Sequence, residues 1–161
     1  MALNTAAITA AMAAMSVTGT STTGTNGVIA IKDINTMDLH VHNRDCPIMI
    51  PAPGEWKGGS SGSPDSETTF GAPGTRFWLV HQTFRYIFFQ AEAGAGRDAN
   101  DHYLAASQNA DLLWTAITAL NISNTDVQAV NIGHIGTIQD PMGGKLIGCF
   151  FEITFRERIN P

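Results

Sequence analysis

The sequence RFWLVHQTFRYIFFQ, residues Arg76–Gln90, contains no glycine or proline and is rich in aromatic and β-branched residues, which favours a β-strand. Side chains alternate across a strand, so its two sets of residues face opposite sides. Between Trp78 and Phe88 one set is apolar apart from Gln82, whereas the other has His81, Thr83 and Arg85 at its centre. The apolar set contains Trp78, Val80, Phe84, Tyr86 and Phe88. We expect this face to be buried and the other to be partly solvated. At about 3.3 Å per residue the strand would span roughly 50 Å, so it should bend, break or project beyond its domain.

Two other stretches have the periodicity of helices. Ala6–Met15 is rich in alanine, and Thr5 is its expected N-cap. Asp101–Leu120 is the second, with Asp98 or Asn100 as its expected N-cap. Their apolar faces contain Ile8, Met12 and Met15 in the first helix and Tyr103, Ala106, Ala110, Leu113, Ile117 and Leu120 in the second. Each helix should therefore lie on a sheet or on another helix.

Shorter stretches predict further strands. These are Val28–Ile34, Ile48–Ile50, Val127–Ile138 and Leu146–Ile159. Pro47 and Pro51 bracket the second, and proline cannot donate to a ladder, so we expect it at a sheet edge or a strand start. Gly133 and Gly136 predict a bulge in the third. The turn residues 140–144 then separate it from the fourth, forming a closing hairpin.

The last of these strands alternates most regularly. Its apolar face contains Ile147, Cys149, Phe151, Ile153, Phe155 and Ile159, and its polar face contains Glu152, Thr154, Arg156 and Arg158. The order of elements predicts the α+β class, with a mixed, mostly antiparallel sheet and two helices packed on one face. The polar face of the last strand would then meet solvent or a neighbouring molecule.

Ala52–Thr75 interrupts this pattern with glycine, proline and serine, a composition that cannot bury a core of its own. We expect a long interaction loop or insertion over residues 51–75, within a single domain spanning residues 1–161. Trp56 and Phe70 lie in this loop. Large aromatic side chains in a solvated segment suggest anchors for a partner, so both are candidate interface residues.

The composition limits the classes of function. Charged residues make up only 14% of the 161 residues, against roughly 25% in typical soluble domains. A low charge suits a surface that is buried in an assembly. The net charge of −5 argues against a dedicated nucleic-acid binder, which needs a basic face. The alanine-rich N-terminus lacks the basic region of a signal peptide, and no apolar run approaches the roughly 20 residues of a membrane span.

Residues 38–42, DLHVH, have the spacing of a metal site, because H-x-H on a strand places both imidazoles on one face. Amidohydrolases and related phosphoesterases hold zinc in this way. Those enzymes use barrels larger than this chain, and a catalytic zinc needs a third protein ligand. The other three histidines are isolated in the sequence. We expect no metal here, and a small metal-dependent hydrolase using His40 and His42 is the distant alternative.

The remaining motifs predict neither a catalytic residue nor a cofactor site. Residues 94–97, GAGR, stand between a strand and a helix but lack the third glycine and the Lys-Ser/Thr of a phosphate loop. We expect this loop to present Arg97 to a neighbouring subunit. No serine lies in a G-x-S-x-G elbow. Cys46 and Cys149 are expected to be buried thiols, with a disulfide left open. Arg156 and Arg158 mark either a solvated strand end or a site of salt bridges between subunits.

The arrangement resembles a known family. A short alanine-rich helix follows Met-Ala-Leu, and CPIMIP (residues 46–51) precedes the Gly/Pro/Ser loop. The aromatic strand leads into GAGR (residues 94–97) and an amphipathic helix, and the closing hairpin ends in FEITF (residues 151–155). This layout is similar to that of the tail terminator, or tail completion, proteins of long-tailed bacteriophages, and the similarity covers nearly the whole chain.

The resemblance implies a structural virion protein that is not an enzyme. Such proteins form a hexameric ring at the head-proximal end of the tail tube, stop its polymerisation and join the tail to the head-side connector. Phage DNA passes through the lumen without sequence-specific binding, and an acidic subunit suits this role. The expected location is the neck region of the virion tail, after assembly in the host cytoplasm. The nearer alternative is another neck, head-completion or tail tube ring protein.

Overall fold

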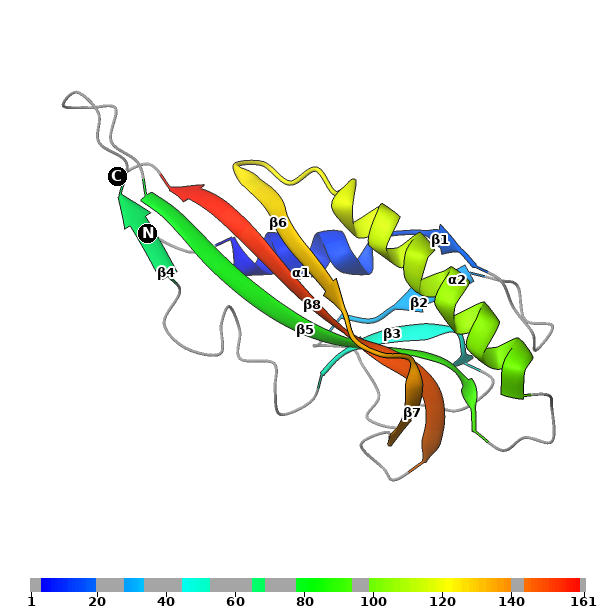
Figure 1. Ribbon diagram of the computed structural model, residues 1–161. Helices are drawn as coiled ribbons and strands as arrows, with labels where there is room; N and C mark the ends of the chain where they lie inside the picture. Colours follow the sequence, from blue (N-terminus) through cyan, green and yellow to red (C-terminus); the bar gives the residue numbers. More distant parts are fainter. Residues whose placement is uncertain are drawn as a thin grey trace.

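The computed structural model describes residues 4–19, 28–33, 45–52, 65–68, 78–93, 99–139 and 144–159. These residues form two helices and one curled sheet (Figure 1). The helices are α1 (Thr5–Ala13) and α2 (Ala99–Thr118). The strands are β1 (Val17–Thr18), β2 (Val28–Ile31), β3 (Ile48–Pro51), β4 (Asp65–Thr68), β5 (Trp78–Glu92), β6 (Thr125–Ile132), β7 (Gly136–Gln139) and β8 (Lys145–Ile159).

The sheet is mixed and mostly antiparallel. Its order is β1-β2-β3-β5-β8-β6, with β4 paired to β5 and β7 paired to β8. Among the described strands, the β2–β3 pair alone is parallel. Both helices pack into the same core on one face of this sheet, α1 through Ile8 and Met12 and α2 through Leu113 and Ile117. The predicted α+β class, with both helices on one face, is therefore confirmed.

The predicted aromatic strand forms the centre of the sheet. β5 and β8 have 15 residues each and pair along their whole length, from Trp78 opposite Ile159 to Glu92 opposite Leu146. Figure 1 shows both strands curving along their length. The register shifts between Phe89 and Ala91, which is the signature of a bulge. The excess length is therefore accommodated by curvature and by a bulge within one continuous strand.

The alternation of β5 is confirmed by its burial. Its apolar set is buried from Val80 to Phe88, with Gln82 included, and Phe84, Tyr86 and Phe88 join the core under the helices. The rings of Phe84 and Phe155 meet edge to face with centroids 5.7 Å apart. The other face is mixed, because its end residues join a second buried cluster. That cluster contains Cys46, Ile48, Ile50, Ala52, Ile87, Phe89 and Leu146.

The helix caps differ from the prediction. α1 begins at Thr5, and Asn4 occupies the N-cap position without a side-chain capping bond. The Thr5 hydroxyl instead donates to Gln82 Oε1 over 2.9 Å, because the first turn rests on the buried polar part of the sheet. In α2, Asn100 lies inside the helix and is not its cap. Asp98 lies outside the described residues.

Three strand predictions are also corrected. β3 lies inside the sheet between β2 and β5 and not at an edge, whereas the other expected position, at a strand start, fits Pro47, which immediately precedes the strand. The glycine-containing stretch between β6 and β7 separates two strands, whereas the bulge lies between Val127 and Ala129. Part of the expected 51–75 loop, Asp65–Thr68, forms β4 against the start of β5. Most of that loop lies outside the described residues.

Candidate protein-interaction surface

The sheet face opposite the helices is the first candidate surface, and we call its β5–β8–β6 part the open face. Side chains directly opposite each other on neighbouring strands share a face. The register therefore places three rows there, His81–Arg156–Asp126, Thr83–Thr154–Ala129 and Arg85–Glu152–Asn131. Both described helices contribute to the core on the other face, so neither of them covers these rows.

Polar pairs join the strands across the open face. The Thr83 and Thr154 hydroxyls are 3.0 Å apart, and Arg85 Nε donates to Glu152 over 3.0 Å. Arg156 donates to Asp126 over 3.1 Å. Exposed ion pairs of this kind stabilise a fold by only about 0.2–1 kcal/mol. These side chains are therefore positioned by the sheet but contribute little to its stability.

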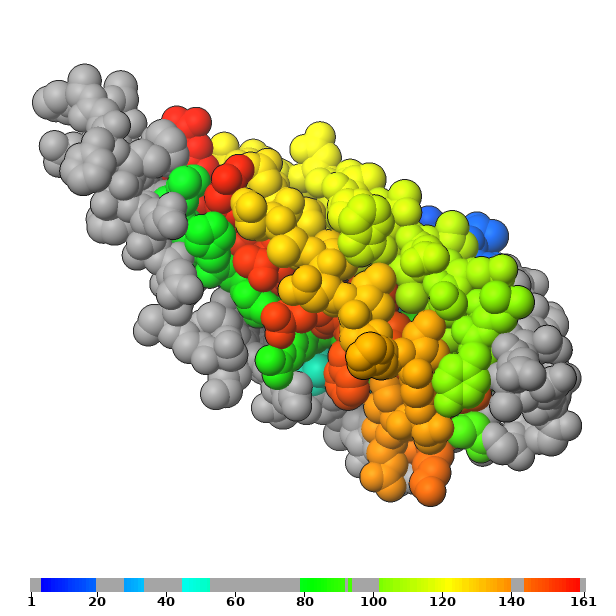
Figure 2. All heavy atoms as spheres, in the orientation of Figure 1, coloured from blue at the N-terminus to red at the C-terminus, as the bar shows by residue number. Residues whose placement is uncertain are grey.

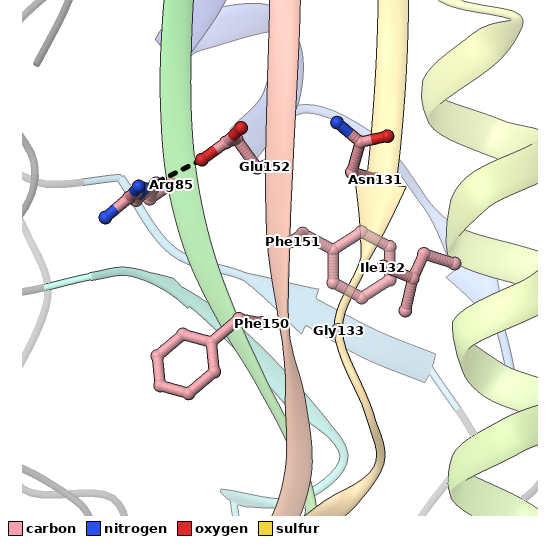
Figure 3. Close-up of a pocket in the computed structure, with 7 residues that line it drawn as sticks. All are labelled: Arg85, Asn131, Ile132, Gly133, Phe150, Phe151 and Glu152. Carbon is pink, nitrogen blue, oxygen red and sulfur yellow. Dashed lines mark hydrogen bonds and ion pairs between the residues drawn. The ribbon is translucent and has the colours of Figure 1, made fainter.

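A hollow of about 420 Å³ lies on this surface where β6 ends (Figure 3). Its lining residues are Arg85, Asn131, Ile132, Gly133, Phe150, Phe151 and Glu152. The Gly133 N–H donates to the Phe150 carbonyl over 2.8 Å, which holds the chain beyond β6 against β8. Phe150 is 44% exposed on the open face, whereas Ile132 pairs with the core-facing Phe151 and directs its side chain to the helix side. An exposed aromatic ring beside an ion pair and an amide forms a site that suits a side chain of another protein.

The outer face of α2 is the second candidate surface, defined by Tyr103, Leu104, Asp111, Leu112 and Trp114. Its four apolar residues are 38–61% exposed. They are spread along the exposed half of the helix, and exposed large apolar side chains on one element make it a candidate contact surface. Figure 2 shows that α2 lies along one side of the molecule beside β6, which it contacts. Tyr103 was predicted to be part of the buried stripe of this helix, but it lies at the margin of the stripe and is exposed.

Two buried polar pairs have a structural role. Glu157 accepts hydrogen bonds from the Gln82 amide over 2.8 Å and from the Asn4 backbone N–H over 2.9 Å. Asn109 donates to Gln90 over 2.7 Å, which fixes α2 on β5. The side chains of Gln82, Gln90, Asn109 and Glu157 are all buried. Buried polar groups with partners position elements rather than carry out chemistry.

The predicted site residues fall into two groups. Trp56, Phe70 and Arg97 lie outside the described residues, as do His40 and His42. Arg156 and Arg158 lie on β8, on the strand face opposite the core. The Arg156 side chain pairs with Asp126 of the same chain. The Arg158 backbone N–H donates to the Asn124 backbone carbonyl over 2.8 Å. Of the five interface candidates, Arg156 and Arg158 therefore lie on the same face of one strand.

The hollow and the outer face of α2 were not predicted, although the sequence contains signals for both. Phe150 precedes Phe151 and so places an aromatic ring on the polar face of the last strand. Leu104 and Leu112 fall outside the apolar stripe of the helix. An apolar residue on the wrong face of an otherwise regular pattern is the signal that marks both surfaces.

Cys46 and Cys149 are both buried thiols, as expected. Burial raises the pKa of the Cys149 thiol to about 12. Over the described ranges, no three His, Cys, Asp or Glu residues are grouped so that they would hold a metal ion. In the same part of the chain, no helix is both long and apolar enough to span a membrane. No protein family model and no curated protein sequence matches this chain.

Proposed function

We propose that this protein is a structural subunit of a phage tail and not an enzyme. Its copies form a hexameric ring at the head-proximal end of the tail tube, where they stop tube polymerisation and join the tail to the head-side connector. One side of the ring reproduces the contacts that a tube subunit makes. The other side rejects the next tube ring and accepts the connector. The proposed location is the neck of the virion.

The observation that carries this proposal is the open face with its hollow. It presents Phe150, which is 44% exposed, on a strand pair whose polar side chains are already joined across the sheet. Exposed apolar groups on a rigid framework favour docking with another protein, because few side chains lose freedom on binding. The second, apolar surface on α2 gives each subunit two different contact surfaces, as a ring requires.

The charge of the chain supports the same role. A net charge of −5 with only 14% charged residues leaves little basic surface to retain DNA in a lumen. Low charge also reduces the desolvation that accompanies ring formation, because few charged groups have to leave water. The sequence layout described above, from the alanine-rich helix to the closing hairpin, adds the specific assignment to the tail terminator family.

Electron microscopy of the purified protein, alone and mixed with phage tail tubes, tests this function. We expect rings at one end of each tube and no tube growth beyond them. A tube protein would instead polymerise into long tubes when purified alone. The variant Phe150→Ser should lose capping, whereas Val28→Ser, which changes a 49% exposed residue on β2, should retain it. Tubes that grow past the protein, or that do not bind it, would contradict the proposal.

A further inference from the structure

We propose that two copies of the free protein pair through the outer edge of β6, so that their sheets join into one continuous sheet around a twofold axis at Asn131. The partner is a second copy of this chain, and the contact is made mainly by backbone groups. A twofold contact uses the same surface of both subunits. It is therefore distinct from the contacts that close a ring, and it goes beyond the proposed function.

The outer edge of β6 is the first observation. β6 is the last strand of the sheet, and among the described strands it pairs with β8 alone (Figure 1). It has 8 residues, whereas β1 at the opposite end of the sheet has 2. β6 contains no lysine or proline, the residues that proteins commonly place on an edge strand to prevent pairing. A bulge between Val127 and Ala129 interrupts its first half, so residues 129–132 are the regular part of this edge.

The ladder between β6 and β8 determines which backbone groups of β6 point outwards. The Gly133 N–H donates to the Phe150 carbonyl, and the register that sets Ile132 opposite Phe151 makes these two residues a hydrogen-bonded pair. In an antiparallel ladder such pairs alternate with pairs whose backbone groups point away from each other. Val130 and Ile132 therefore direct their N–H and C=O groups away from β8. Over the described ranges, no backbone hydrogen bond engages either residue on that side.

These outward groups are complementary to those of a second β6 strand that runs antiparallel to the first. With Asn131 opposite its own copy, Val130 of each chain lies opposite Ile132 of the other, and each such pair exchanges both of its N–H···O bonds. The same register sets β-branched side chains against each other, which suits the surface of a sheet. Ile132 is 36% exposed and points to the helix side (Figure 3), and Val130 is partly buried there. The pairing therefore also covers apolar surface that water reaches in one chain.

The charges of β6 favour this antiparallel arrangement over a parallel one. Asp126 is the one charged residue of the strand, and it lies five positions before Asn131. The twofold axis at Asn131 therefore separates the two Asp126 residues by ten positions, or roughly 33 Å at about 3.3 Å per residue. A parallel pair in the same register would place them side by side, and like charges directly opposite each other are destabilising. The regular part of the edge, residues 129–132, has no charge of its own to oppose the pairing.

Disulfide trapping tests the register. Asn131→Cys should place two thiols opposite each other in a pair whose Cα atoms are about 4.5 Å apart, within the range that a disulfide spans. Ala129→Cys is the matched control, because Ala129 is exposed on the same face of β6 but would lie four positions, or roughly 13 Å, from its copy. Mild oxidation should convert Asn131→Cys into disulfide dimers and leave Ala129→Cys without them. The native thiols, Cys46 and Cys149, are buried and do not compete in the folded protein.

A charge on the edge gives an independent readout. Ile132→Lys should weaken dimerisation about tenfold or more, measured by analytical ultracentrifugation, while the circular dichroism spectrum stays that of the parent. Val28→Ser, a change of an exposed apolar residue on β2, should dimerise normally.

Amide hydrogen exchange of the unmodified protein tests the same contact without a mutation. The Val130 and Ile132 amides should become more protected as the protein concentration rises, whereas the Asn131 amide, which faces β8, should be protected at every concentration. Equal disulfide yields from the two cysteine variants, or rapid exchange of Val130 and Ile132 at every concentration, would overturn the inference. Tube capping is measured separately, so loss of the dimer leaves the proposed function intact, and dimers of a protein that does not bind tube ends would contradict that function alone.

Discussion

The Gln82 side-chain amide donates a 2.8 Å hydrogen bond to the Glu157 carboxylate, although the two residues are 75 positions apart. Gln82 is fully buried and Glu157 is 6% exposed. The same carboxylate oxygen accepts the backbone N–H of Asn4 over 2.9 Å, at the start of α1. The positive end of the helix dipole also favours a carboxylate at this position. One buried anion thus joins β5, β8 and the first helix.

Glu157→Ala should destabilise the protein by about 2–4 kcal/mol, because it leaves the Gln82 amide and the Asn4 N–H buried without their acceptor. Urea unfolding monitored by circular dichroism measures this change. Glu152→Ala is the control, since Glu152 lies on the same strand but its side chain is 41% exposed, and we expect a loss below about 1 kcal/mol.

A double variant separates the bond from the burial. Gln82→Leu together with Glu157→Leu removes both polar groups and should cost less than the two single losses added together. A double variant whose loss equals that sum would mean that the two side chains act independently, against the pairing seen here.

Gly148→Ala should be severely destabilising. Gly148 lies in β8 opposite Phe89, and an added methyl group would overlap the Phe88 carbonyl oxygen of the neighbouring strand. We expect a loss of about 3 kcal/mol, since the contact is with backbone that cannot move aside without breaking the ladder. Gly136→Ala is the matched control, because Gly136 pairs with Gly148 and has open space around it. A thermal shift for Gly136→Ala as large as that for Gly148→Ala would contradict this account.

Phe84→Asp should prevent folding. Phe84 is 1% exposed in the core under the helices and meets the Phe155 ring edge to face. The change removes the ring contacts and buries a carboxylate without a partner, and each of these effects costs several kcal/mol on an expected total of only about 5–15 kcal/mol. The soluble fraction after expression and the near-ultraviolet circular dichroism spectrum report the outcome. Thr83→Asp is the control, because Thr83 directly precedes Phe84 but lies on the open face. This variant should yield folded protein.

The sequence predicts the faces of β5 and β8 well, because alternation is a local property that burial on one side imposes. It does not predict which residues meet across the sheet. Gln82 was visible as a break in an apolar face, and Glu157 occupies a similar position in β8, but their pairing depends on a register that alternation leaves open. The hollow depends on the same register together with the end of β6. It therefore follows from tertiary structure and not from any one segment.

Other errors arose where local composition and tertiary context disagree. Asp65–Thr68 has no apolar residue and lies among glycines and prolines, yet it pairs with β5 as β4. Backbone hydrogen bonds to an existing strand edge are available to any non-proline sequence. The two prolines of the β3 region were expected to place it at an edge or at a strand start; it is not at an edge, but Pro47 does immediately precede the strand, and the prolines flank its ladder bonds without interrupting them. Propensity is a weak guide where a neighbouring strand supplies the partners.

Stability should fall at alkaline pH, partly because of Cys149. Burial raises the pKa of this thiol to about 12, whereas a thiol in an unfolded chain ionises near pH 8.5. Between these values the unfolded state loses its proton first, so the free energy of unfolding decreases with pH by up to about 1.4 kcal/mol per unit. Below the unfolded value the thiol is protonated in both states and has no effect. Burial, and to a lesser extent the Asp33 carboxylate, raises the pKa of the Tyr86 hydroxyl well above its usual value and acts in the same direction at higher pH.

Urea unfolding at a series of pH values from 7 upwards measures this slope. The variant Cys149→Ala should show a shallower decrease between roughly pH 9 and pH 10 than the parent, because Tyr86 contributes equally to both proteins and the thiol contributes to the parent alone. Equal slopes for the two proteins would show that Cys149 is not the source.

Arg156 gives the last test, because it separates stability from assembly on the open face. Its ion pair with Asp126 joins side chains that are 39% and 73% exposed, so Arg156→Ala should change the free energy of unfolding by less than about 1 kcal/mol. Arg156→Glu reverses the charge of a side chain that we propose meets a neighbour, and it places two carboxylates together on that surface. We expect this variant to stay folded and to cap tail tubes about tenfold less well, an effect equivalent to the loss of one modest interfacial contact. Arg156→Lys keeps the charge and should lie close to the parent. If Arg156→Glu caps tubes as the parent does, this end of the open face is solvated in the ring, and the contact surface is confined to the hollow and the strand residues around Phe150.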